Sequence, residues 1–148
     1  MKMISLKPIT KENWRDAINL EVHEQQKEFI ASNTYSIAQV QFLEDFKAMG
    51  VYLEDKMIGF AMYGIDEDDY HYWIYRLMIQ KELQGKGYGL MALQDVIADI
   101  KQNNKMQKPH ITIGYHPENE GARHTYKRAG FVETRIAPWG EQLALLKI

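Results

Sequence analysis

The run Gln84-Gly85-Lys86-Gly87-Tyr88-Gly89 sets the tightest limits on how this chain folds, because it combines three alternating glycines with a lysine. It lies between a predicted strand at residues 70–79 and a predicted helix that begins at Gly87 or Tyr88 and runs to Lys101. Glycines let backbone amides converge on one point, and a helix start adds unpaired donors and the positive end of its dipole. The segment therefore predicts a cradle for a pyrophosphate group, with Lys86 as a mobile positive charge beside it.

Two common nucleotide-binding motifs do not fit this run. A P-loop requires Ser or Thr after Gly-Lys to hold magnesium, whereas Gly85-Lys86 is followed by Gly87. A dinucleotide fingerprint requires glycines at its first, third and sixth positions, but the sixth residue counted from Gly85 is Leu90. The hydrolysis of ATP or GTP and the binding of NAD are therefore disfavoured.

Alternating and helical patterns of apolar residues predict one α+β domain over residues 1–148, with an interior βαβ crossover around the glycine run. Strands are predicted at residues 3–9, 51–54, 57–63, 70–79, 109–115, 131–136 and 141–148. Helices are predicted at residues 10–19, 21–30, 36–49, 87–101 and 119–129, with Ser36 as the N-cap of the third. In the central strand we assign one face to Trp73, Tyr75, Leu77 and Ile79, and the other to Tyr72, Ile74 and Met78.

The composition is typical of a soluble domain and excludes several classes of protein. Hydrophobic residues make up 45% of the chain and charged residues 26%, and the lack of cysteine excludes disulfides, thiolate metal sites and cysteine nucleophiles. The first residues lack the apolar run of a signal peptide and no stretch approaches 18 apolar residues, so we expect a cytoplasmic protein without membrane segments. The five scattered histidines predict no metal site. A net charge of -2 disfavours nucleic acid as a partner and suits a cationic substrate.

Two spaced motifs resemble those of the GNAT-type N-acetyltransferases. The first has Gln or Arg, two residues, Gly, one residue and then Gly or Ala after a central strand, and its positions are occupied by Gln84, Gly87 and Gly89. The second is reproduced by Asn119, Ala122, Tyr126, Gly130 and Phe131. The motifs occur in the family's order, and the predicted strands and helices agree with the family over nearly the whole chain.

The resemblance implies a three-layer fold, in which a mixed, mostly antiparallel sheet of six or seven strands lies between helices. It also implies that the central strand splays from residues 109–115 and that acetyl-CoA binds in the wedge between them, paired with the strand backbone. Tyr126 matches the tyrosine that protonates the departing thiolate in many members. The residues that the resemblance assigns to the cofactor are Leu77, Met78, Ile79, Gln84, Gly85, Lys86, Gly87, Tyr88, Gly89, Asn119 and Ala122.

Two groups of acidic residues indicate a positively charged acceptor. Residues 66–69 put four consecutive carboxylates between two strands, and Glu21, Glu24 and Glu28 recur at helical spacing in the region that covers the acceptor site in the family. Residues 26–33, 35–39 and 59–64 resemble the spermine and spermidine acetyltransferase branch, which implies a primary amine of a polyamine or diamine as acceptor. The residues assigned to this substrate are Glu24, Glu28, Phe29, Tyr35, Asp69 and Tyr75, with Phe29 and Tyr35 packed along its methylene groups.

Other acceptors and other roles stay open. An aminoglycoside, an amino acid or a protein amino terminus would use the same cofactor half, and both acidic groups are also explained as solvated surface. A non-catalytic acetyl-CoA sensor and a nucleic-acid-modifying relative are further alternatives, the latter disfavoured by the net charge of -2. The central strand carries no carboxylate, so no general base is identified. Residues 141–148 are expected to be an edge strand, which leaves a homodimer open.

Overall fold

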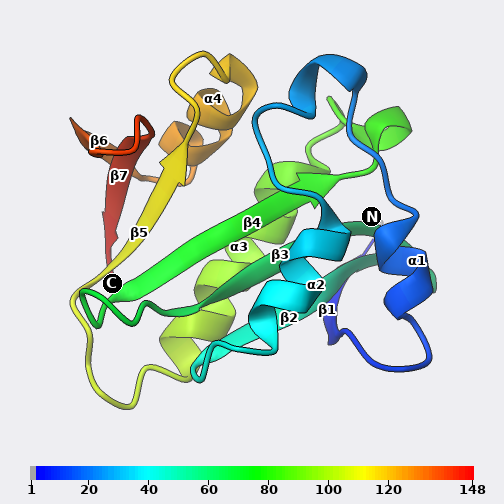
Figure 1. Ribbon diagram of the computed structural model, residues 1–148, viewed down its shortest axis with the longest axis horizontal. Helices are drawn as coiled ribbons and strands as arrows, with labels where there is room; N and C mark the ends of the chain where they lie inside the picture. The colour runs from blue at the N-terminus through cyan, green and yellow to red at the C-terminus, as the bar shows by residue number, and fades with distance from the viewer. Residues whose placement is uncertain (1–2) are drawn as a thin grey trace.

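Seven strands form one mixed sheet in the computed structural model, which describes residues 3–148 (Figure 1). Their order is β1-β2-β3-β4-β5-β7-β6, and every neighbouring pair is antiparallel except β4 and β5. The strands are β1 (Ile4–Pro8), β2 (Phe46–Leu53), β3 (Lys56–Ile65), β4 (Tyr72–Ile79), β5 (His110–Tyr115), β6 (Val132–Ile136) and β7 (Gln142–Lys147). The α+β fold with a mostly antiparallel sheet is thereby confirmed.

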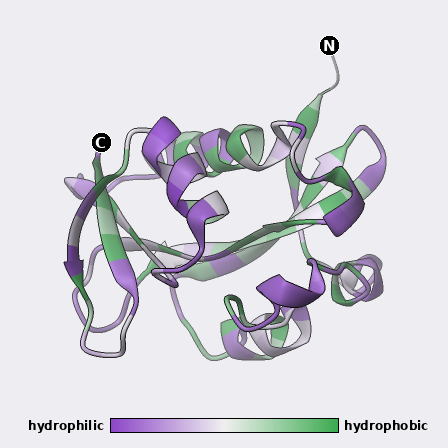
Figure 2. Cartoon of the chain, turned by 90° about the horizontal axis from the view of Figure 1, so that it is seen from above, coloured by the Kyte–Doolittle hydropathy of each residue, from purple (hydrophilic) through white to green (hydrophobic). Residues whose placement is uncertain are grey.

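Helices cover both faces of the sheet, so that the molecule has three layers (Figure 2). They are α1 (Trp14–Ile18), α2 (Asn33–Val40), α3 (Tyr88–Gln102) and α4 (Glu120–Arg128), and single 3-10 turns occur at Glu24–Gln26 and Lys81–Leu83. α1 and α2 pack on one face, and α3 and α4 on the other. Leu93, Ile97 and Ile100 of α3 are buried against the sheet, which confirms the helical period of this segment. Among the described residues, no helix has the length and apolar character needed to cross a membrane.

β4 and β5 run parallel but pair over only three residues each. Residues 72–74 of β4 lie opposite residues 111–113 of β5, and beyond Ile74 the two strands diverge (Figure 1). α3 connects them and completes the predicted βαβ crossover. The divergence confirms the wedge, and it leaves the backbone groups of residues 75–79 that face β5 without a strand partner.

A β-bulge interrupts β4 at Tyr75. Two successive residues of β3 lie opposite Ile74 and Arg76, so that Tyr75 has no partner on β3. Tyr75 packs with the core on the α2 side, whereas Leu77 and Ile79 pack with the core on the α3 side. The prediction that these three side chains share one face is therefore wrong, because the extra residue shifts the alternation of the strand.

The predicted helix at residues 21–30 is wrong, because this segment contains only the 3-10 turn Glu24–Gln26. Its backbone is held by the loop that follows β4 instead of by a helix of its own. The N–H of Glu21 donates to the side chain of Gln80 at 2.8 Å, and the carbonyl of Glu21 accepts from the N–H of Lys81 at 2.8 Å. Tertiary hydrogen bonds thus override the helical spacing of the glutamates.

The predicted helix at residues 36–49 combines parts of a helix and a strand. α2 begins before Ser36, since Ser32 is the N-cap and its hydroxyl accepts the N–H of Tyr35 at 3.0 Å. The helix ends at Val40, and residues 46–49 already belong to β2. Neither Gly nor Pro marks the break between them, so the apolar pattern reads as continuous.

The strand at the carboxyl terminus lies inside the sheet, because β7 pairs with β5 on one side and with β6 on the other. The prediction that residues 141–148 form an edge is therefore wrong, and the two edge strands are β1 and β6. This topology brings the turn between β6 and β7 beside the end of β5, next to the wedge.

Candidate active site

The glycine run forms an open loop at the start of α3. Gly85 and Gly87 have positive φ angles of 79° and 90°, and a Cβ atom on either residue would meet no protein atom within 4 Å. Gly87 is the N-cap and offers no side chain to the helix, and the first helical bond runs from Met91 N–H to the Gly87 carbonyl. The amide groups of residues 88–90 precede that bond and remain available to an anion, beside the exposed Lys86.

Gln84 fixes the position of this loop. Its side-chain amide donates to the carbonyl of Ile79 at 2.9 Å and to the side chain of Gln26 at 3.0 Å, while Gln26 donates back at 2.9 Å. Both N–H bonds of the Gln84 amide are thereby used within the protein. The structure gives this residue a role in shaping the cradle, and its predicted contact with a cofactor stays a prediction.

Leu77, Met78 and Ile79 form the wall of the wedge on the β4 side. Their backbone lies beyond the last residue that pairs with β5, so a ligand can add to it as a strand would. Leu77 and Ile79 pack on the α3 side of the sheet, and Met78 packs on the α2 side.

α4 supplies Tyr126 on the β5 side. Asn119 caps the helix by accepting the N–H of Ala122 at 3.2 Å, and Ala122 packs on the core. The ring of Tyr126 lies 5.2 Å from that of Tyr115 at the end of β5. Burial, followed by the charge of Glu141, raises the pKa of Tyr126, and within residues 3–148 its hydroxyl forms no hydrogen bond. The hydroxyl therefore keeps its proton at neutral pH.

The segment before α2 covers the wedge from the other side. Phe29 stacks on His116 with ring centroids 4.7 Å apart, which joins this segment to the loop between β5 and α4. Glu24 pairs with Lys27 at 2.8 Å, and Glu28 is exposed. Two of the three glutamates predicted to form an acidic wall are thus paired with lysine, since Glu21 also pairs with Lys81 at 3.1 Å.

A pocket of about 470 Å³ opens on the α2 side of the bulge. We call it the acidic pocket, because carboxylates from two loops reach it. Its lining residues are Gln39, Asp66, Asp68, Asp69, Trp73, Ile74, Tyr75, Arg76, Gly114, Arg135, Trp139 and Glu141. Of the six residues predicted to bind substrate, Asp69 and Tyr75 line it, and the exposed Tyr35 lies near its rim with its ring 5.9 Å from the guanidinium carbon of Arg76. Glu24, Glu28 and Phe29 lie outside this lining.

Three aromatic side chains of the acidic pocket each donate to one of its carboxylates. The Nε1–H of Trp73 donates to Asp69 at 2.8 Å, and the hydroxyl of Tyr75 donates to Asp66. The third such pair is Trp139, whose Nε1–H lies 2.6 Å from Glu141 Oε1. Trp139 and Glu141 were not found from the sequence, since only the fold brings their turn to β4.

Arg76 also lines the acidic pocket, and the bulge turns its side chain toward α2 together with that of Tyr75. Its guanidinium donates to the carbonyl of Tyr75 and to the side chain of Gln39, each at 3.0 Å. Its Nε has no partner among the described residues. Burial lowers the pKa of Arg76. The two oxygens that accept from its guanidinium, those of the Tyr75 carbonyl and the Gln39 side chain, are both neutral.

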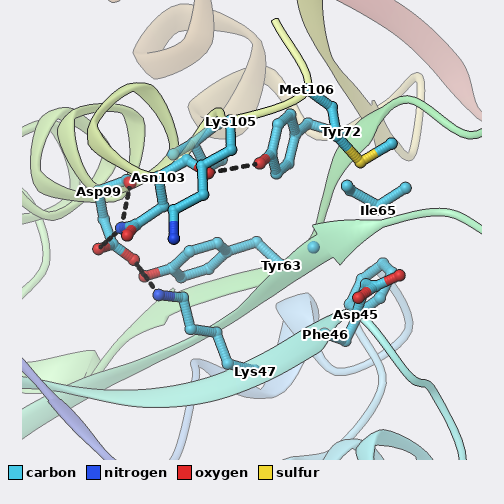
Figure 3. A pocket seen from close by; sticks show the side chains of 12 residues that line it. Asp45, Phe46, Lys47, Tyr63, Ile65, Tyr72, Asp99, Asn103, Lys105 and Met106 are labelled. Atoms are coloured by element: carbon cyan, nitrogen blue, oxygen red, sulfur yellow. Dashed lines mark hydrogen bonds and ion pairs between the residues drawn. The ribbon is translucent and has the colours of Figure 1, made fainter. Parts of the chain in front are cut away.

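A second cavity, of about 310 Å³, lies on the α3 side of the sheet between the ends of β3 and α3 (Figure 3). Its polar groups satisfy one another around Asp99, which accepts from Tyr63 at 2.6 Å and from Asn103 at 3.0 Å and pairs with Lys47 at 2.6 Å (Figure 3). This cluster ties the end of α3 to β2 and β3. Across residues 3–148, no three His, Asp or Glu side chains gather as a metal site.

Comparison with known proteins identifies the family. The family model described as "Acetyltransferase (GNAT) family" matches residues 6–131. The chain is 31% identical over 134 residues to the "Probable spermine N(1)-acetyltransferase" of Bacillus subtilis subsp. natto (strain BEST195), covering 86% of this chain and 87% of that protein. It is 30% identical, with the same coverage, to the "Spermine/spermidine N(1)-acetyltransferase" of Bacillus subtilis (strain 168). An aminoglycoside acetyltransferase solved in complex with coenzyme A has the same fold, with a TM-score of 0.78 at 17% identity over 98% of this chain and 95% of that one. The chain therefore belongs to the acetyltransferase (GNAT) family.

Proposed function

We propose that this chain transfers an acetyl group from acetyl-CoA to a primary amine of a polyamine such as spermidine or spermine. One observation carries the proposal: the bulge of β4 adjoins both the wedge that leads to the glycine cradle and the acidic pocket. Family membership supports acetyl transfer, and the two Bacillus subtilis relatives support a polyamine as the acceptor.

The cradle and the wedge suit the two chemically different parts of acetyl-CoA. The free amides at the start of α3, with Lys86 beside them, suit a pyrophosphate. The unpaired backbone of residues 75–79 suits the amide groups of the pantetheine arm, and its N–H groups are able to polarise a carbonyl that reaches the bulge. The neighbour solved with coenzyme A supports the same cofactor here. When bound, acetyl-CoA supplies the acetyl group as a reactive thioester.

Tyr126 is the proposed proton donor. As the amine nitrogen bonds to the acetyl carbon, the carbon–sulfur bond breaks and the sulfur takes up a proton. Burial raises the pKa of Tyr126, so its hydroxyl holds its proton until the negative charge that develops on the sulfur draws it away. The amine loses its own proton on the side of the acidic pocket, where carboxylates and solvent are available.

The acidic pocket suits a cationic acceptor with apolar stretches. Four carboxylates against two arginines give it an excess of negative charge, and Trp73 and Trp139 offer aromatic surface. An aminoglycoside is the second candidate, since it also carries several ammonium groups and a neighbour of the same fold is named for it. The indole rings offer apolar surface on which the methylene groups of a polyamine can pack.

The test is the release of free coenzyme A thiol from acetyl-CoA with each of six acceptors, followed by the mass of each product. The acceptors are spermine, spermidine, putrescine, lysine, an aminoglycoside and a peptide. We expect one added acetyl group on spermine or spermidine, measurable turnover of putrescine, and little turnover of lysine, the aminoglycoside and the peptide. Turnover of the aminoglycoside or peptide alone would contradict the polyamine proposal, and no turnover of any amine would contradict acetyl transfer.

A further inference from the structure

The same kind of hydrogen-bonded pair, an aromatic donor with a carboxylate, occurs three times in the acidic pocket. Each aromatic donor in it is committed to a different carboxylate, in the pairs Trp73–Asp69, Tyr75–Asp66 and Trp139–Glu141. The Trp73 ring centroid lies 6.1 Å from that of Tyr75, edge-on, and 6.4 Å from that of Trp139. The three rings are therefore neighbours along one wall of the pocket.

These pairs remove hydrogen-bond donors from the pocket. An indole has one N–H and a phenol one O–H, so a ring that donates to a carboxylate has no donor left. What remains is the electron-rich face of each ring and the oxygen of Tyr75, which is able only to accept. No N–H or O–H of the described residues donates to that oxygen. The faces of these rings attract cations.

The pairs with Asp66 and Asp69 are also held rigidly. Asp66 is 9% exposed, and its Oδ2 accepts the N–H groups of Asp68 and Asp69 at 2.9 and 3.2 Å, which fixes the carboxylate in a turn. Asp69 accepts the N–H of His71 at 2.9 Å with one oxygen while the other accepts from Trp73. The rings are thus oriented by carboxylates that are themselves anchored to the backbone.

The position of the rings relative to the wedge indicates which part of the acceptor they meet. Trp73 lies where β4 still pairs with β5, before the wedge opens beyond Ile74. The proposed reaction lies at the bulge, and from Trp73 to Tyr75 the strand advances by about 7 Å at 3.3 Å per residue. A nitrogen that reacts in the wedge is therefore separated from the rings by a chain of several carbon atoms.

We propose that Trp73, Tyr75 and Trp139 form a cage for a second, non-reacting ammonium group of the acceptor, and that Asp66, Asp69 and Glu141 are the positioning residues that set its polarity. This inference rests on the proposed function and adds a requirement to it: the acceptor carries two amines separated by a flexible apolar chain. Of the two arginines of the pocket, Arg76 is directed to Gln39 on α2.

A matched pair of acceptors tests the cage. Putrescine and 1-aminopentane have the same length and one reactive primary amine in common, but a methyl group replaces the second ammonium in 1-aminopentane. We expect the KM for 1-aminopentane to be on the order of 10-fold or more above that for putrescine, with a similar kcat. Equal KM values with measurable turnover would overturn the cage and leave acetyl transfer intact.

Binding without turnover separates the cage from the proposed reaction. Two of the three tryptophans, Trp73 and Trp139, belong to the cage and only Trp14 lies elsewhere, so intrinsic fluorescence reports its occupancy. Titration of the cofactor-free protein with putrescine, and with tetramethylammonium as a probe of the cage alone, is expected to change the emission saturably, whereas 1-aminopentane acts more weakly. Saturable binding in a protein that acetylates no amine would support the cage and contradict the function, and no response to either probe would overturn the cage.

Single substitutions test which side chains of the pocket cause the difference in KM between putrescine and 1-aminopentane. Trp139→Leu is expected to raise the KM for putrescine several-fold and to leave that for 1-aminopentane nearly unchanged, since the side chain is 62% exposed and its loss spares the core. Glu141→Gln keeps an acceptor for the Trp139 N–H but removes the charge, and is expected to have a smaller effect of the same kind. Glu67→Gln is the control, because it removes one charge from the same loop outside the pocket. A Glu67→Gln effect as large as that of Trp139→Leu would show general charge attraction and overturn the cage.

Discussion

Gln26 and Gln84 exchange two side-chain hydrogen bonds, of 2.9 and 3.0 Å, although 58 residues separate them in the chain. The Gln84 amide also reaches the carbonyl of Ile79, the last residue of β4. One side chain therefore ties the glycine cradle to the wall of the wedge and to the segment before α2. The geometry of the cradle depends on this tie, because glycine residues on their own fix no single conformation.

Gln84→Ala is expected to lower the free energy of unfolding by about 1–3 kcal/mol, because it leaves the Ile79 carbonyl and the Gln26 amide without partners. It should also weaken the binding of coenzyme A, which calorimetric titration measures directly. Gln26→Ala should cost a similar amount, since it removes both bonds to Gln84 and the bond from the His23 N–H at 3.0 Å, but it leaves the bond between Gln84 and Ile79. Gln94→Ala, on the exposed face of α3, is the control and should alter neither quantity. Unchanged coenzyme A affinity in Gln84→Ala would contradict the role of this tie.

Gly87→Ala is expected to lower the free energy of unfolding by about 1–2 kcal/mol, because its φ of 90° disfavours a side chain although the space is open. Its effect on coenzyme A affinity should be much larger, since the new methyl group occupies the space in front of the amides. Gly140→Ala is a matched control, with a φ of 103° and equally open space in the turn between β6 and β7. If both variants bind coenzyme A equally well, the cradle does not hold the cofactor.

The helix start at the glycine run and most of the strands along the chain were predictable from the sequence, because they depend on local signals. Gly87 stands where a buried strand gives way to a helix with a regular apolar stripe, and both elements formed as predicted. Asn119 likewise caps α4 through its own side chain. Such features depend on residues a few positions apart in the chain, so the amino-acid sequence nearly determines them.

The acidic pocket was only partly predictable, because it depends on contacts between distant segments. Asp69 was found as a member of an acidic run, but its pairing with Trp73 required the actual path of the loop. Trp139 and Glu141 reach the pocket only because β7 lies between β5 and β6, which the sequence did not indicate. The bulge at Tyr75 was also missed, since a two-residue period predicts the faces of a strand only while its register is unbroken.

Tyr63 should make the stability of the protein fall at high pH. Burial, followed by the hydrogen bond to Asp99, raises the pKa of Tyr63 above its ordinary value of 10.0. A raised pKa contributes stability below the unfolded value, and this contribution is lost as the pH rises beyond about 10, because the unfolded chain ionises first. Tyr75, Tyr115 and Tyr126 shift in the same direction.

Urea unfolding of the wild type between pH 8 and pH 11 should therefore show a decline above pH 10. In Tyr63→Phe the free energy of unfolding should start lower, because Asp99 loses a donor, but should fall less steeply by up to about 1.4 kcal/mol per pH unit. Equal slopes for the two proteins would show that Tyr63 ionises as easily in the folded state as in the unfolded one.

Tyr126→Phe is expected to lower kcat by on the order of 100-fold or more while coenzyme A affinity stays the same, because the variant removes only the proton donor. Its stability should change little, since the hydroxyl has no hydrogen-bond partner among the described residues. Tyr115→Phe is the matched control: its ring lies 5.2 Å from that of Tyr126, but its hydroxyl donates to Glu133. That variant should lose stability and keep most of its kcat. Steady-state kinetics with saturating acetyl-CoA and thermal unfolding separate the two patterns, and a kcat that survives Tyr126→Phe would assign the proton to another donor.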